Sequence, residues 1–193
     1  MRLLHFVLRK KRQQRLAKST AGFTLIEVIV VVVMVSILAA ISVFSLQSWA
    51  NRVRVNGVQD KVLIAIREGQ TRARQQAIPW QVSFKQDPQA GDLNIQMAIH
   101  PGSVTPTRWT SIDEPGVQID TDRTFTNFRQ QPGNPPYWYI RFDNKGNVVR
   151  EEAPNPLPAR ITISYKGTMP RRCVEVVTLL GATRSEGDGS CGN

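Results

Sequence analysis

The chain has 193 residues, of which 41% are hydrophobic and 21% are charged, and these values exclude an intrinsically disordered chain. Its formal net charge is +10, but seven of the 25 basic residues and none of the 15 acidic ones lie in residues 1–22. The basic excess is therefore mostly a property of the N-terminus. The rest of the chain is too evenly charged to indicate nucleic-acid binding by composition.

The basic segment 1–22 is followed by an apolar run, residues 23–46, that is long enough to cross a bilayer. The run is longer than the apolar part of an ordinary secretory signal, and no small-x-small cleavage site follows it. The positive charges in front of the run predict a cytoplasmic N-terminus and a head on the far side of the membrane. A plain single-pass anchor is the alternative interpretation.

The junction between the two segments, residues 21–27, reads AGFTLIE. It resembles the class III signal of type IV pilins and type II secretion pseudopilins. The resemblance implies that a prepilin peptidase cuts between Gly22 and Phe23 and methylates the new Phe23 amine. It also implies residence in the inner membrane and then in a pilus or pseudopilus. The implied partners are the peptidase, other pilins and an inner-membrane assembly platform.

Glu27 is the only charged residue in the apolar run, and an isolated charge in hydrocarbon costs at least about 2.5 kcal/mol. After cleavage at Gly22, the Phe23 amine lies one helical turn before Glu27. In a bundle of such helices, Glu27 of one subunit can face the amine of its neighbour, so that each charge compensates the other. We therefore expect Phe23 and Glu27 to form an assembly contact.

A single long helix is predicted from Phe23 to about Ile78, with a length of about 84 Å. All twelve prolines lie at or beyond Pro79, which is expected to end the helix. Residues 23–46 form the membrane or filament-core half. In residues 47–78, apolar or small side chains recur every three or four residues and predict one face that packs on a head. Gly57 is a candidate soft point. The face is formed by Val58, Val62, Ala65, Ile66, Gly69, Ala73 and Ala77.

The remaining residues, 79–193, are predicted to form the head. Apolar residues alternate with polar ones in seven segments, which predicts short strands. These segments are residues 80–84, 93–100, 116–120, 137–142, 147–150, 160–165 and 173–180. Residues 143–146, DNKG, predict a hairpin turn with Gly146 at positive φ. The predicted fold class is α+β, one long N-terminal helix packed on a small antiparallel β-sheet head.

The head resembles the GspH/FimT group of minor pilins and pseudopilins, through REGQTRARQQAIPW, RFDNKGNV and RCVEVVTLLGATR. The resemblance implies a small two-sheet head. In FimT-like members a glycine-arginine-x-arginine motif after the last strand binds DNA. Here Gly181 and Arg184 match that motif, whereas Ala182 replaces its first arginine. The candidate DNA contacts are Lys166, Arg171, Arg172, Gly181 and Arg184.

Two cysteines, Cys173 and Cys191, lie beyond the membrane segment, where oxidation is permitted. A disulfide between them would hold down the tail SEGDGSCGN, which contains too much glycine to order itself. The alternative is two free thiols. A metal site is disfavoured because no CxxC occurs and both histidines are distant in sequence.

No catalytic motif occurs, so we expect no enzyme and no cofactor. His100, the only histidine in the head, is interpreted as structural, and Asp143, Asn144 and Asn147 as turn residues rather than a calcium loop. Three hypotheses for the function remain. The chain is a minor pilin that joins or primes a type IV pilus, a DNA-binding pilin for uptake, or a type II secretion pseudopilin.

Overall fold

The computed structural model describes residues 22–87, 94–149 and 157–192, except for the side chains of residues 41–45. The predicted leader therefore lies outside the described residues, apart from Gly22. Contacts divide the chain into two compact units, Met1–Val43 and Phe44–Asn193.

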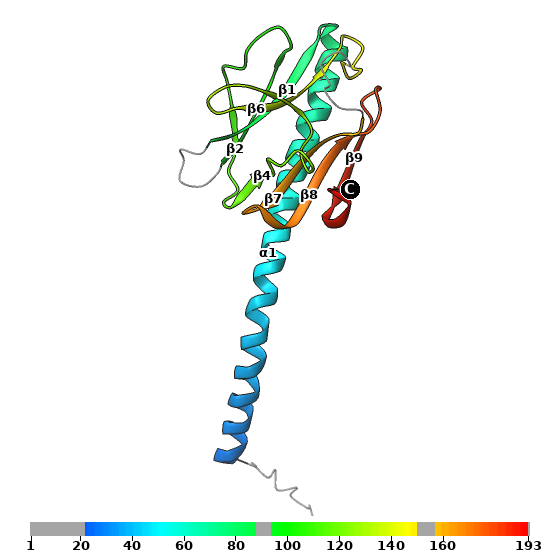
Figure 1. The fold of residues 1–193 in the computed structure, drawn as a ribbon. Helices are drawn as coiled ribbons and strands as arrows, with labels where there is room; N and C mark the ends of the chain where they lie inside the picture. The colour runs from blue at the N-terminus through cyan, green and yellow to red at the C-terminus, as the bar shows by residue number, and fades with distance from the viewer. Residues whose placement is uncertain (1–21, 88–93, 150–156, 193) are drawn as a thin grey trace, which may run out of the picture. The chain divides into compact units, whose positions relative to one another are not determined.

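One long helix, α1 (Leu25–Gln76), is the first element, as predicted (Figure 1). It begins two residues later and ends two residues earlier than expected. Ala77 has a φ of 53°, outside the helical range, and Ile78 precedes Pro79, a position that disfavours helical backbone. Gly57 lies within the unbroken helix, so no soft point is seen there.

The second unit contains two antiparallel sheets. The first has the order β3-β2-β1-β6-β5, and the second has the order β4-β7-β8-β9. Their strands are β1 (Trp80–Asp87), β2 (Asn94–Pro101), β3 (Thr110–Ile112), β4 (Val117–Ile119), β5 (Arg129–Gln131), β6 (Tyr137–Phe142), β7 (Ala159–Tyr165), β8 (Thr168–Val176) and β9 (Thr183–Gly187). A short 3-10 helix, Asp188–Ser190, follows β9. The predicted α+β class, a long helix on antiparallel sheet, is confirmed.

Both sheets pack on the C-terminal half of α1 around a single core. The helix contributes a fully or almost fully buried face, including Val58, Val62 and Ile66. Phe84 and Phe142 come from the first sheet, and the second sheet adds apolar side chains from β7 and β8. Burial of each such side chain contributes about 1.5–3 kcal/mol. The predicted helix face is thus confirmed, except that Ala77 is exposed and outside the helix.

Several predicted strand limits were wrong. Residues 147–149 form no strand, and only Val148 makes an isolated bridge to Phe142. Residues 177–180 belong to a turn instead of a strand, because Gly181, at a φ of 79°, reverses the chain there. The turn at residues 143–146 is present, and Gly146 has a φ of 79° as predicted.

The sequence analysis did not predict a strand at residues 183–187, which form β9 and pair with β8. Its side chains are polar, and the pairing is made by backbone groups that the alternation of side chains does not reveal. The sequence therefore contained no apolar signal for this strand.

Candidate processing junction and assembly surface

The predicted processing junction lies at the start of α1. Gly22, Phe23 and Thr24 precede the helix, and Phe23 is 80% exposed. The Thr24 hydroxyl accepts a hydrogen bond from the Glu27 backbone N–H at 3.3 Å, and the Thr24 carbonyl accepts one from Val28 N–H at 3.2 Å. Thr24 is therefore the N-cap of α1, and the peptide between Gly22 and Phe23 lies outside the helix.

Glu27 occupies the third position of the helix, so Thr24 and Glu27 have the spacing of a capping box. A carboxylate at this end is also favoured by the helix dipole. The sequence analysis missed the cap, although the Thr-x-x-Glu pattern before an apolar run is its usual signal.

The helix that follows exposes apolar side chains around its whole circumference. In the first unit, the large apolar residues from Phe23 to Leu38 are between 48% and 80% exposed. A helix that is apolar on all sides normally lies in apolar surroundings. Within the part of the chain that the structure describes, no helix is both long and apolar enough to span a membrane.

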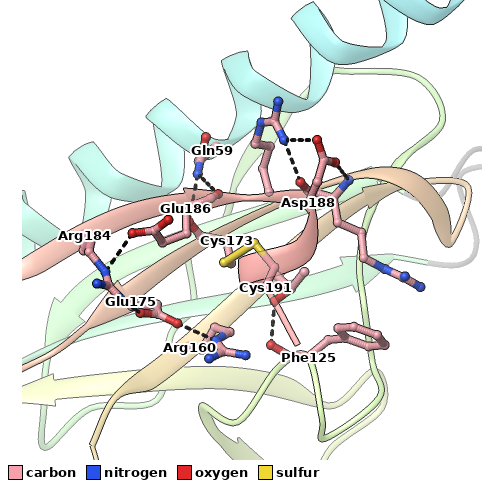
Figure 2. The surroundings of a disulfide bond; sticks show 12 residues. Gln59, Phe125, Arg160, Cys173, Glu175, Arg184, Glu186, Asp188 and Cys191 are labelled. Atoms are coloured by element: carbon pink, nitrogen blue, oxygen red, sulfur yellow. Dashed lines mark hydrogen bonds and ion pairs between the residues drawn. A yellow bond between two sulfur atoms is a disulfide. The ribbon is translucent and has the colours of Figure 1, made fainter. Parts of the chain in front are cut away.

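The predicted disulfide is confirmed. Cys173 of β8 and Cys191, after the 3-10 helix, are joined, with their Cα atoms 5.7 Å apart (Figure 2). Both cysteines are fully buried. Gln59 of α1 lies close by and donates to the carbonyls of Cys173 at 2.8 Å and Glu186 at 2.9 Å. The helix and the last two strands are thus held together around the disulfide.

The candidate DNA contacts Arg171 and Arg172 are both paired with carboxylates of the head. Arg171 Nε lies 3.0 Å from Asp120 Oδ2, and its guanidinium stands 4.1 Å from the centre of the Phe125 ring. Arg172 Nη1 lies 2.9 Å from Asp188 Oδ2. The positive charges of Arg171 and Arg172 are therefore largely compensated by these carboxylates, which weakens their attraction for DNA phosphates.

Arg184 is paired as well, although its side chain is 59% exposed. Its Nη2 lies 2.9 Å from Glu175 Oε2 and its Nε lies 2.9 Å from Glu186 Oε1. The hydrogen bond to Glu175, with the charges of both carboxylates, raises the pKa of Arg184. On its other side Glu175 accepts from Arg160 Nε at 2.6 Å. Figure 2 shows this chain of ion pairs from β7 to β9.

The two remaining candidates, Lys166 and Gly181, lie in turns at opposite ends of β8. Lys166, in the turn before β8, stands 5.7 Å from the Tyr165 ring centre. Gly181, in the turn after β8, packs against Gln70 of α1. A nine-residue strand spans about 30 Å, so the structure does not bring the candidates into one patch.

His100 belongs to a buried polar chain on the first sheet. Arg141 donates to Gln81 Oε1 at 2.9 and 3.2 Å, Gln81 donates to Ser83 Oγ at 3.0 Å, and Ser83 Oγ lies 3.0 Å from His100 Nε2. His100 Nδ1 lies 3.0 Å from the Pro101 carbonyl, which can only accept. Nδ1 therefore carries a proton that it donates to this carbonyl. Burial, with a smaller contribution from Arg141, lowers the pKa of His100.

Comparison with known proteins adds a family motif. Residues 17–43 match the family model of the prokaryotic N-terminal methylation motif. Two crystal structures of the type IV minor pilin FimU of Pseudomonas aeruginosa (strain PAO1) are similar to the chain, each at 12% identity. The P21 form has a TM-score of 0.47 and the alignment covers 74% of this chain and 98% of FimU. The P65 form has a TM-score of 0.43, with 70% and 98% covered. No curated protein sequence matches the chain.

The methylation motif and the long helix on antiparallel sheets together support a type IV pilin-like protein. This confirms the class predicted from residues 21–27.

Proposed function

We propose that the chain is a minor subunit of a type IV pilus-like filament. In this proposal the leader is removed between Gly22 and Phe23, and the apolar run 23–46 holds the subunit in the membrane until it enters the filament. The observation that carries the proposal is a methylation motif, residues 17–43, that extends into a helix whose apolar side chains are exposed on all sides. Such a helix needs either lipid or other helices around it.

Glu27 is proposed to select the register of assembly. The new Phe23 amine and the Glu27 carboxylate carry opposite charges one helical turn apart. The amine of one helix can therefore pair with the carboxylate of a neighbouring helix. Removal of one partner would leave the other charge buried and unpaired, which costs about 3–5 kcal/mol. A type II secretion pseudopilus would use the same contact between Phe23 and Glu27.

The test follows Glu27→Ala in cells that assemble filaments, with Ser36→Ala as the matched control. Ser36 is an exposed polar residue of the same apolar segment, and its hydroxyl bonds only its own helix, at Val32 O. We expect Glu27→Ala to be inserted and cut at Phe23, as seen by mass spectrometry, but to be depleted from sheared filaments about tenfold or more. Glu27→Gln should resemble Glu27→Ala, since the charge is lost in both. Incorporation of Glu27→Ala at the level of Ser36→Ala would refute the pairing.

A further inference from the structure

The end of the head that lies beside residues 48–52 of α1 carries exposed apolar and basic side chains. Trp49 is 66% exposed, and Met169, next to the turn between β7 and β8, is 58% exposed. Arg52 and Lys166 are exposed as well. These four residues, Trp49, Arg52, Lys166 and Met169, are called the basal surface. Tryptophan is highly buried on average, so an exposed indole indicates a partner.

A groove of about 420 Å³ brings the two segments of the basal surface together. Its helix side is formed by Ser48, Asn51 and Arg52, and its hairpin side by Met169 and Pro170. Figure 1 shows the β7–β8 hairpin beside α1 at this end of the head. The guanidinium of Arg52 and the amide of Asn51 are both hydrogen-bond donors, and such donors bind phosphate oxygens.

The carboxylates next to the basal surface are already paired. Asp188 also lines the groove, and its Oδ2 lies 2.9 Å from Arg172 Nη1. Glu114 belongs to the loop that contacts the β7–β8 turn, and its Oε1 lies 3.4 Å from Lys61 Nζ. Neither carboxylate therefore compensates the cations of the basal surface.

The two cations of the basal surface are available to an anion. Among the residues that the structure describes, neither the Arg52 guanidinium nor the Lys166 ammonium makes a hydrogen bond or an ion pair. Lys166 Nζ stands 5.7 Å from the centre of the Tyr165 ring, which leaves its positive charge uncompensated. Two such cations beside exposed apolar side chains match the anionic headgroups and apolar interior of a lipid layer.

The position of the basal surface in the chain matches the headgroup layer of a bilayer. Trp49 follows the end of the apolar run 23–46 by about 4.5 Å of helix, and Arg52 follows it by about 9 Å. The headgroup layer on one side of a bilayer is about 5–8 Å thick, and a long arginine side chain can reach into it. Tryptophan is enriched at this depth. Met169 lies across the groove from Arg52, so it lies at a similar depth.

We propose that the basal surface binds the anionic phospholipid surface of the membrane that holds the apolar run. Arg52 and Asn51 bind a lipid phosphate in the groove, and Lys166 contacts a second headgroup. Trp49 and Met169 enter the boundary between headgroups and acyl chains. The contact holds the head in one orientation until the subunit leaves the bilayer for a filament. This inference rests on the proposed function, which places the apolar run in the membrane.

The test places the full chain in nanodiscs and follows a bimane fluorophore attached at Met169→Cys. The discs contain phosphatidylcholine alone or mixed with phosphatidylglycerol, and both carry some lipid with a spin label in the headgroup, which quenches bimane. We expect strong quenching only with phosphatidylglycerol, and less of it at high salt because salt screens the attraction. The native cysteines are not labelled, since they are joined and buried. Leu180→Cys, 70% exposed in the turn at the other end of β8, is the control probe and should not be quenched.

Charge variants test which residues hold the lipid. Arg52→Gln and Lys166→Gln each remove one cation and should each lower the ratio of bound to free basal surface about fivefold. Lys145→Gln, a change of the same kind in the exposed turn after β6, should have no effect. The Cys173–Cys191 disulfide is measured for every variant to show that the head folds.

Three results would overturn the proposal. The first is a Met169 probe that is not quenched in discs with phosphatidylglycerol. The second is equal quenching in both kinds of disc, which would remove the role of anionic lipid. The third is a probe that is free in discs and becomes protected only in assembled filaments, which would assign the basal surface to another subunit.

The outcomes separate this inference from the proposed function. If the chain does not stay in the discs, the apolar run is not a membrane segment and the proposed function fails. If the chain stays in the discs and the Met169 probe remains in water, only the contact between the basal surface and lipid is wrong.

Discussion

Gly69 of α1 lies directly against Val82 of β1, so close that a Cβ at Gly69 would overlap the Val82 Cγ2 methyl. Val82 is fully buried, and its side chain is short and branched, unlike the flexible end of a long side chain. The glycine thus sets the distance between the helix and the first sheet.

Gly69→Ala should destabilise the head by about 1–2 kcal/mol, because overlap in a packed core outweighs the gain in helix propensity. Gly57→Ala is the matched control on the same helix, where the Cβ meets open space, and it should stabilise by about 0.5–1 kcal/mol. Urea unfolding of the detergent-solubilised chain measures both. Adding Val82→Ala to Gly69→Ala should cost less than the sum of the single changes, and simple additivity would contradict the proposed overlap.

Glu175→Gln should lower the free energy of unfolding by about 3 kcal/mol. The Glu175 carboxylate is 1% exposed and faces two arginines, so the substitution removes a buried charge that Arg160 Nε contacts at 2.6 Å and Arg184 Nη2 at 2.9 Å. Glu186→Gln removes only the exposed contact with Arg184 and should cost about 0–1 kcal/mol. Equal effects of the two substitutions in urea unfolding would show that burial of Glu175 is not the cause.

Removal of the disulfide by Cys173→Ser/Cys191→Ser should lower stability by about 3 kcal/mol. The bond closes a loop of 18 residues in the unfolded chain, and its loss restores the conformational entropy of that loop. Reductant should shift the thermal transition of the wild type by a comparable amount and leave the double variant unchanged. A transition of the wild type that is insensitive to complete reduction would contradict this expectation.

His100 should make the head less stable in mild acid. Because burial lowers its pKa in the folded state, the unfolded chain binds the proton more readily. The stabilising contribution of neutral His100 is therefore complete above the ordinary pKa of about 6.5 and is lost as the pH falls through the lowered folded value. Urea midpoints at pH 7.5 and pH 5.5 measure the effect. His100→Gln should reduce the difference between the two midpoints, and an unchanged difference would assign it to other groups.

DNA binding by the head should be weak and only slightly dependent on salt. Arg171, Arg172 and Arg184 each face a carboxylate, and Lys166 lies at the far end of β8 from Gly181. With about one uncompensated cation, the slope of log K against log salt should be near −1. Fluorescence anisotropy with duplex DNA tests this, beside Arg184→Ala, which should bind equally. A steep slope that becomes shallower in Arg184→Ala would instead support the DNA-uptake hypothesis.

Most of the architecture could be predicted from the sequence, but not the polar strands. The long helix, its buried face and the strands β1, β2, β6 and β7 follow from apolar periodicity. Strands β5 and β9 were not predicted, because their side chains are polar and the strands are defined by backbone pairing with their neighbours. The strand predicted at residues 147–150 was wrong. Two adjacent valines favour a strand there, but only Val148 makes a β-bridge.

The sequence by itself determined the prepilin-like motif that includes Gly22 and Phe23, the unbroken helix and the pairing of the only two cysteines. Each of these features depends on the charge, the spacing or the number of residues in a short segment. Such properties can be read from the sequence without knowledge of the rest of the fold. Only the tertiary structure decided that Arg171 faces Asp120, 51 residues away, and that Arg184 shares Glu175 with Arg160. It also decided which side of α1 remains exposed. Those relationships depend on strand register and on packing between distant segments, which local sequence patterns do not encode.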